Sequence, residues 1–167
     1  ATGEHRRFLF PAVLRSPGPD GFRFIVVVIE WRPAGIELTV NAMVAAHAVL
    51  VPLQAEFFAL EGLSQLMLTV REVRQTANPD LRIEGVLVTM SDARNNLSQQ
   101  VEADGRRTLG EVVFNVVIPR NVRVSEAPSY AVPVLEYDST SKGSQAYRAL
   151  AGEILARQRQ RVGEEPR

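Results

Sequence analysis

Hydrophobic residues along the chain form two kinds of pattern, continuous runs and runs with helical spacing. Continuous runs rich in Val, Ile and Leu predict buried strands at residues 24–29, 48–53, 83–90 and 112–118. Apolar residues three or four positions apart predict helices at residues 38–46, through Leu63–Val73, and at residues 96–109 and 141–157. The second of these helices is expected to end before Asn78-Pro79, because proline disfavours helix in the residue before it.

The two ends of the chain and its later loops carry weaker patterns. Residues 1–21, rich in Gly and Pro, predict an irregular arm; residues 22–157 predict one α/β domain, and residues 158–167 a frayed, charged tail. Residues 120–129 are expected to form a polar loop and residues 132–137 a short extended piece. The residues of the closing helix expected to face inward are Tyr147, Leu150, Ala151 and Ile154.

The order of these elements predicts the fold class. Strands alternating with helices of this length imply parallel βαβ units with right-handed crossovers. The predicted fold is therefore α/β, a doubly wound and mostly parallel sheet with helices on both faces. Ligands of such sheets bind at the carboxyl ends of the strands. We therefore expect the chemistry of the protein in the segments that follow Ile29, Leu53, Met90 and Ile118.

Composition narrows the classes of function. The absence of cysteine excludes disulfides and thiolate metal sites. No window reaches the eighteen or so apolar residues of a membrane span, and we expect a cytoplasmic protein. The net charge of zero argues against a strongly basic nucleic-acid binder, although a local basic patch is compatible with it. No Gly-x-Ser-x-Gly or His-Glu-x-x-His motif suggests a hydrolase.

Several strings at the predicted strand ends occur in an order and spacing that resemble one family. They are Thr39–Ala42, Val51–Leu63, Asn78–Leu81, Glu84–Met90, Asp92–Arg94, Ile118–Arg123, Ser125–Ser129, and Tyr137–Asp138 followed by Ser141–Gly143. Together they resemble the ParA/Soj branch of the deviant Walker ATPases, over about residues 22–157. The resemblance implies a P-loop NTPase-like fold that is incomplete at the N-terminus.

The resemblance also implies a function in chromosome or plasmid partitioning. Members of the family couple ATP-dependent dimerisation, with Mg²⁺, to non-specific DNA binding on the nucleoid. A ParB-like partner protein bound at a centromere-like site stimulates hydrolysis. We expect these properties of the family, and self-association of this chain, because a sheet without its phosphate-loop strand exposes an edge or apolar surface. Folding of residues 1–16 over that edge is the alternative to self-association.

One part of the family pattern is missing and another is altered. The family's Walker A loop needs a Gly-Lys pair at the phosphates, but Lys142 is the only lysine here and it follows Ser141. We therefore expect this chain to lack ATPase activity. Glu30 occupies the position of the Walker B aspartate. It is a candidate for the Mg²⁺ shell, and the alternative is a glutamate at a strand end that faces solvent.

The resemblance places two further groups of candidate residues. Arg94 and Arg123 match family arginines that hold DNA phosphates, for which the planar guanidinium is suited; the alternative is that both are solvated surface arginines. The residues expected at the base pocket of a nucleotide follow two strand ends, where the alternative is ordinary loop packing: Thr89, Met90, Pro119, Arg120 and Asn121. Asn121 is also a typical turn residue, and Asp138 and Lys142 are expected only in loop and helix-cap roles.

Two other functions remain as alternatives. The first is a non-enzymatic ParA-like module that binds a partition partner or a ParA protomer. The second is a MinD-like positioning protein, which ranks last because such a protein needs an amphipathic membrane helix. The segment after Ala151 is rich in arginine but lacks a broad apolar face, so no membrane partner is expected.

Overall fold

The computed structural model of the protein describes residues 36–56 and 59–164. The elements in chain order are α2 (Ile36–Ala45), β1 (Ala48–Gln54), α3 (Ala59–Thr76), β2 (Arg82–Thr89), α4 (Asn96–Leu109), the 3-10 turn η2 (Gly110–Val112), α5 (Val122–Glu126), the 3-10 turn η3 (Ala127–Tyr130), α6 (Val134–Tyr137) and α7 (Lys142–Glu164). The arm predicted at residues 1–21, the strand predicted at residues 24–29 and the candidate metal ligand Glu30 lie outside the described residues.

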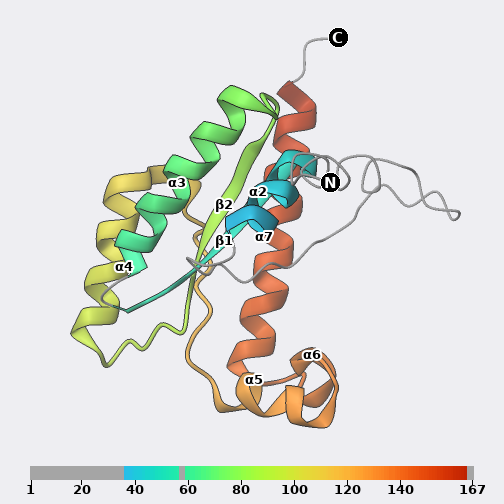
Figure 1. Ribbon diagram of the computed structural model, residues 1–167. Coiled ribbons are helices and arrows are strands. Elements are labelled where there is room, and N and C mark those ends of the chain that lie inside the picture. The colour runs from blue at the N-terminus through green and yellow to red at the C-terminus, as the bar shows by residue number, and fades with distance from the viewer. Residues whose placement is uncertain (1–35, 57–58, 165–167) are drawn as a thin grey trace, which may run out of the picture. The chain divides into compact units, whose positions relative to one another are not determined.

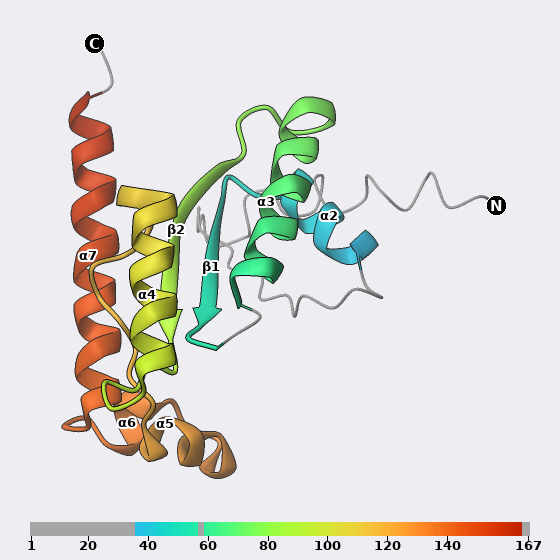
Figure 2. The same ribbon diagram turned by 90° about the vertical axis from the view of Figure 1, so that its left-hand side faces the viewer.

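The two strands pair in parallel. The His47 carbonyl accepts a hydrogen bond from the Arg82 amide at 3.3 Å, and the Thr89 carbonyl accepts one from the Ala55 amide at 3.0 Å. The residue numbers of the partners rise together, so the strands point the same way, as Figure 2 shows. Glu84 to Val88 of β2 are all buried, as predicted. In β1 burial alternates from Leu50 onward, which corrects the prediction of a strand buried on both faces.

The chain divides into two compact units. Of the described residues, the first unit contains residues 36–49 and 63–84, and the second contains residues 50–56, 59–62 and 85–164. In the described ranges no helix is long and apolar enough to cross a membrane.

The first unit is held by an apolar core and one buried amide. The core packs α2 against α3 through Met43 and Val44 of α2 and Val70 and Val73 of α3, and Leu81 before β2 joins the same cluster. Asn78 is 3% exposed, and its side-chain amide donates to the carbonyls of Met43 and Ala46 at 2.9 and 2.8 Å. Both carbonyls belong to the end of α2, where a helix leaves its last acceptors without an internal partner. Asn78, in the turn after α3, therefore supplies hydrogen-bond donors to the carbonyls at the end of α2.

The second unit has its core beneath α7. Leu150 of α7 packs with Leu87, Phe114 and Ile118, and Tyr147 and Ile154 border the cluster as predicted. Ala151, predicted to face inward, is exposed, and Ala146 packs against the core instead. The reason is helical spacing: Ala146, Leu150 and Ile154 lie four residues apart on one stripe, and Ala151 falls beside it. The helix also continues beyond Arg157 to Glu164.

The strand predicted at residues 112–118 is not regular. Its backbone pairs with β2 only at intervals: the Phe114 amide donates to Val86, and the Ile118 amide to Val88, both at 2.9 Å. Between these points the amides of Asn115 and Val116 donate to the Glu153 carboxylate on α7, each at 2.9 Å. Backbone amides that would pair with a neighbouring strand are thus hydrogen-bonded to a side chain instead. The run of apolar residues predicted a regular strand because it carries no sign of this bonding.

Arginine side chains satisfy the carbonyls of the same segment. Arg106 of α4 donates to the carbonyls of Phe114 and Asn115, at 3.0 and 3.2 Å. Arg157 of α7 donates to the carbonyls of Glu111 and Val113, both at 3.0 Å, and its guanidinium lies over the Phe114 ring at 4.3 Å. The Glu153 carboxylate also accepts from Arg157 at 2.7 Å. Two helices therefore fix the irregular segment through charged side chains.

Two predicted non-helical segments contain short helices. The loop predicted at residues 120–129 holds α5 and η3, and the extended piece predicted at residues 132–137 holds α6. Both helices lie against the first turns of α7 (Figure 1). The Asn121 side chain caps α5 by accepting from the Arg123 amide at 2.9 Å. Helices of four and five residues are too short for apolar periodicity to reveal them, and the Asn121 cap is the clearest sequence signal of α5.

We expect Gly85→Ala to destabilise the protein. A Cβ at this position would lie 2.4 to 2.9 Å from three atoms of the Phe114 ring, which is fully buried and cannot easily shift. The free energy of unfolding should fall by about 1–3 kcal/mol. The control is Gly152→Ala on α7, where nothing lies within 4 Å, and where alanine should add about 0.5–1 kcal/mol. Urea denaturation measures both; equal effects would contradict the close packing.

A second prediction concerns Glu153. Burial alone raises the pKa of Glu153, but the amides of Asn115 and Val116 and the Arg157 guanidinium together hold this pKa below its ordinary value. The stabilising contribution of the carboxylate is therefore complete above the ordinary glutamate pKa of about 4.3, and is lost as the pH falls through the lowered pKa.

Glu153→Gln should reduce the free energy of unfolding at pH 7 by about 1–3 kcal/mol, because an amide NH₂ then faces a backbone N–H donor. The deficit relative to the parent should shrink as the pH falls below about 4. The matched control is Glu72→Gln on the exposed face of α3, which should change stability by less than about 0.5 kcal/mol. Urea denaturation at several pH values measures both variants, and a deficit that does not depend on pH would contradict this assignment.

Candidate functional site

The structure brings together the two strand-end segments that the sequence singled out. The Ser91 amide donates to the Ile118 carbonyl at 3.2 Å, and the Arg120 amide donates to the Ser91 carbonyl at 2.9 Å. A parallel bridge joins Ser91 to Pro119. The loop that follows β2 and the segment before α5 are therefore fixed side by side, as expected for the carboxyl ends of neighbouring parallel strands.

The five residues predicted at a base pocket have different surroundings. The Thr89 hydroxyl donates to the Leu53 carbonyl at 3.4 Å, and Asn121 is used as the cap of α5. Met90 has a φ of 55°, a left-handed conformation that turns the chain sharply at the end of β2. Arg120 lies 3.5 Å from Glu56, with both side chains more than half exposed. Of the five, Pro119 lines a depression in the surface.

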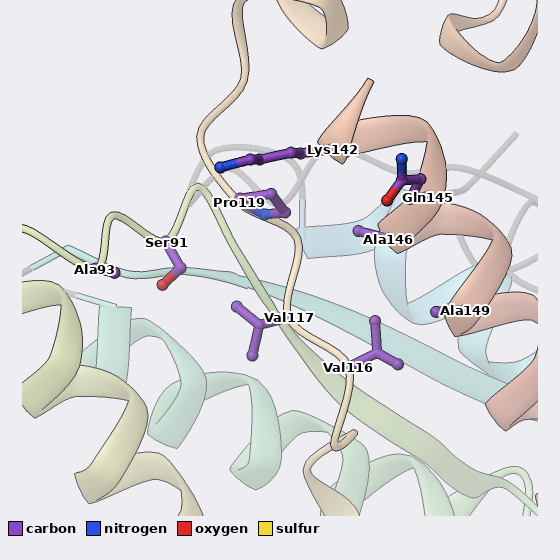
Figure 3. A pocket seen from close by; sticks show the side chains of 9 residues that line it. All are labelled: Ser91, Ala93, Val116, Val117, Pro119, Lys142, Gln145, Ala146 and Ala149. Carbon is purple, nitrogen blue, oxygen red and sulfur yellow. The ribbon is translucent and has the colours of Figure 1, made fainter. Parts of the chain in front are cut away.

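This depression, of about 470 Å³, is shallow and open to solvent. Its floor is apolar, formed by Val116 and Val117 with alanines of α7, and its rim carries Ser91, Lys142 and Gln145. In Figure 3 the Lys142 side chain extends toward Pro119, while Ala146 and Ala149 line the α7 side. An apolar floor with a few polar groups at the rim is the usual chemistry of a small-molecule site.

Arg94 lies on the loop after β2 and is held by its neighbour Asp92. The Nε and Nη2 atoms of Arg94 donate to the two carboxylate oxygens of Asp92 at 3.1 and 3.2 Å. These hydrogen bonds lower the pKa of Asp92, and the same contact raises the pKa of Arg94. The Arg94 side chain is 91% exposed, so its contact with Asp92 is open to exchange with solvent or a ligand.

Arg123 lies at the start of α5 among acidic and aromatic side chains. Its Nη1 atom donates to Glu126 at 2.9 Å, and its Nε atom lies 3.5 Å from Asp138. The Tyr137 hydroxyl donates to the same oxygen of Glu126 at 3.3 Å, and the Tyr137 ring stacks on Tyr130 with ring centres 4.9 Å apart. The hydrogen bond to Glu126 raises the pKa of Arg123. We call these side chains around Arg123 the acidic cradle: Glu126, Tyr130, Tyr137 and Asp138.

The acidic cradle is fixed to α7 by a close junction. Gly143 is buried at the start of α7, and a Cβ there would lie 2.4 Å from Val124 of α5. Ser144, which is fully buried, donates to the carbonyls of Val134 and Asp138 at 2.9 and 2.6 Å. The first turn of α7 therefore holds α5 and α6 in place through a glycine contact and a buried hydroxyl.

Asp138 takes part in both the junction and the cradle. Its Oδ1 atom accepts from the amide and the hydroxyl of Thr140, at 3.1 and 2.9 Å. The Thr140 side chain lowers the pKa of Asp138, with further help from the charge of Arg123. This leaves Oδ2 as the oxygen nearest Arg123. The sequence predicted only the loop and cap role of Asp138; its proximity to Arg123 depends on α6, which the sequence did not predict.

No metal centre is found in the part of the chain that the structure describes. Among residues 36–56 and 59–164, no three His, Asp or Glu side chains gather as metal ligands. Glu30, the predicted Mg²⁺ ligand, lies outside these ranges. The metal assignment therefore stays a prediction from the sequence.

Comparison with known proteins finds that the chain is similar to partitioning proteins. Residues 21–83 match the family model described as an AAA domain. The chain is 55% identical over 148 residues to the chromosome partitioning protein ParA of Caulobacter vibrioides, covering 89% of this chain and 54% of that protein. It is 49% identical to the chromosome-partitioning ATPase Soj of Thermus thermophilus, covering 86% and 56% of the two chains. The chain thus spans about half the length of these relatives.

Solved structures agree on the fold. Cobyrinic acid a,c-diamide synthase from Mycobacterium smegmatis is 36% identical, with a TM-score of 0.55 over 71% of this chain and 42% of the other. The same enzyme was solved with an ATP analogue and magnesium, and matches with a TM-score of 0.53. The predicted α/β fold, of P-loop NTPase type, is confirmed. The chain is a homologue of the ParA and Soj chromosome-partitioning proteins and corresponds to part of their length.

Proposed function

We propose that this chain acts in the partitioning of chromosomes or plasmids, as part of a ParA/Soj-type ATPase that binds non-specific DNA. The observation that carries the proposal is the pair of backbone hydrogen bonds between Ser91 and the Ile118–Arg120 segment. They fix the loop that bears Arg94 beside the segment that leads to Arg123. Two arginines on adjoining strand-end loops suit a ligand with phosphates spaced along it.

The nucleotide belongs to the same proposal. The depression beside Pro119 has an apolar floor and a polar rim, which suit a purine base. Lys142 at its rim is the only lysine of the chain and follows Ser141, so no Gly-Lys pair is available for a phosphate loop. The described residues therefore fit the base of ATP better than its phosphates or Mg²⁺. In a protein that holds both parts, these residues would bind the base while a phosphate loop supplies the charge.

A partner and a location belong to the same proposal and are supported by the similarity to ParA and Soj proteins. We propose that a ParB-like protein acts on the intact ATPase, which works in the cytoplasm on the nucleoid. Self-association of this chain is part of the same proposal, since members of the family act as dimers. The alternative of a non-enzymatic module that binds a partition protein predicts pull-down of that protein without nucleotide; failure to retain it would remove this alternative.

We expect no detectable binding of ATP by this chain alone. Most nucleotide affinity comes from phosphate contacts, and the chain has one lysine and no phosphate loop sequence. Isothermal titration calorimetry with Mg²⁺ and ATP measures this directly, with adenosine as the control that probes the base alone. Micromolar affinity for ATP would mean that Glu30 and the loops after Met90 and Ile118 suffice for a nucleotide site. The missing phosphate loop would then not be disabling, contrary to our expectation.

We expect the arginines to carry the affinity for DNA. At roughly 50 mM salt, the double variant Arg94→Ala/Arg123→Ala should bind a mixed-sequence duplex about tenfold more weakly than the parent. The slope of log affinity against log salt should be shallower by up to about two, one for each lost phosphate contact. Fluorescence anisotropy measures both quantities.

The control for this experiment is a variant with the same change of charge elsewhere. Arg71 and Arg74 are exposed on α3 and belong to no predicted contact. Arg71→Ala/Arg74→Ala should therefore bind the duplex nearly as tightly as the parent. Equal loss in the two double variants would mean that net charge alone sets the affinity, and would remove Arg94 and Arg123 from the proposed interface.

A further inference from the structure

We propose that the acidic cradle competes with DNA phosphates for Arg123 and so limits the affinity of this surface for DNA. The inference rests on the proposed function, because it assigns a regulator to the DNA contact of Arg123. Glu126 and Asp138 are the competing groups, and Tyr137, which stacks on Tyr130, holds Glu126 in place.

The charge balance around Arg123 is the first argument. One guanidinium lies within 2.9 Å of the Glu126 carboxylate and 3.5 Å of the Asp138 carboxylate. The local sum is therefore one negative charge, although Arg123 itself is positive. A phosphate that approaches this site meets a net repulsive field until a carboxylate moves away. Arg123 can take a phosphate strongly only when its contact with Glu126 or Asp138 opens.

The second argument is that both carboxylates accept hydrogen bonds from residues other than Arg123, which fix their positions. The Glu126 oxygen that accepts from Arg123 also accepts from the Tyr137 hydroxyl, and Tyr137 is stacked on Tyr130 at an interplanar angle of 27°. Asp138 is anchored through Oδ1 by two hydrogen bonds from Thr140. Most exposed ion pairs are weak because both side chains must be ordered to form them. Here the acidic partners are already ordered, so the pair persists at a lower entropic cost.

Arg94 provides a contrast within the same chain. Its side chain is 91% exposed and has one acidic partner, Asp92, two residues away in the same loop. The Arg123 side chain is 51% exposed and has two acidic partners, Glu126 in the same helix and Asp138 directly after α6. Arg94 and Asp92 sum to zero charge, whereas the acidic cradle with Arg123 sums to minus one. The two arginines should therefore differ in how readily they release their partners to bind phosphate.

The test measures binding of a fluorescein-labelled, mixed-sequence duplex by Glu126→Gln at roughly 50 mM salt. Affinity should rise about three- to tenfold over the parent, as the local charge becomes zero. The slope of log affinity against log salt should steepen by up to about one, because Arg123 then releases counterions on binding. Arg123→Ala introduced into the Glu126→Gln variant should cancel the gain, which a general effect of charge would not do.

The matched control is Glu136→Gln on α6, which removes one negative charge nearby. Glu136 is exposed, and its carboxylate has no ion pair in the described part of the chain. If Glu136→Gln strengthens binding as much as Glu126→Gln, net charge explains the gain and the inference is wrong. A second variant, Tyr137→Phe, removes only the hydroxyl that holds Glu126, and should strengthen DNA binding in the same direction by a smaller factor.

The outcomes separate this inference from the function on which it rests. If Arg94→Ala/Arg123→Ala loses binding but Glu126→Gln gains none, the DNA contact stands and competition by the cradle is wrong. If the double arginine variant binds as tightly as the parent, the proposed DNA surface itself is wrong. Absence of DNA binding by both the parent and Glu126→Gln overturns both. Thermal denaturation of each variant shows that the folded state is being compared.

Discussion

The second unit depends on how the backbone of residues 113–118 satisfies its hydrogen bonds. A buried strand usually does so through its neighbours on both sides, because an unpaired amide away from water costs about 1–3 kcal/mol. Here the Glu153 carboxylate accepts two amides, while Arg106 and Arg157 donate to four carbonyls of residues 111–115. Three charged side chains from two helices thus replace part of a strand ladder.

This arrangement connects stability to the candidate site. Ile118 is fixed by β2 on one side and by the core under α7 on the other. The next residues reach Ser91 within hydrogen-bonding distance and then enter α5 at the Asn121 cap. Arg123 is therefore positioned by a series of contacts that begins in the core. Glu153, Arg106 and Arg157, which hold this segment, are charged. Changes in pH and salt should therefore affect the position of the segment as well as the charges of the site itself.

Much of the fold could be predicted from the sequence, for physical reasons that differ between elements. α4 was predicted at its observed bounds because apolar residues three or four positions apart run through residues 96–109; its Asn95 cap was not used in the prediction. Predictions were wrong where side chains of distant helices replaced backbone partners, as at Asn115 and Val116, since no local pattern encodes Glu153. They were also wrong at α5 and α6, which are shorter than two turns and show no periodicity. For the site, Arg94 and Arg123 came from a resemblance, whereas the acidic cradle needs α6 to bring Asp138 near Arg123.

The contact of Gly143 with Val124 has a consequence for the evolution of this surface. Any side chain at position 143 must displace α5 or the valine, because even a methyl group would lie 2.4 Å from it. Single substitutions of Arg123, Glu126 or Asp138 can each change the local charge by one unit without a steric clash. The glycine offers no such gradation, since the smallest step already forces Val124 or α5 to move. Sequence drift on this surface should therefore tune its electrostatic strength freely while the geometry beneath it stays constant.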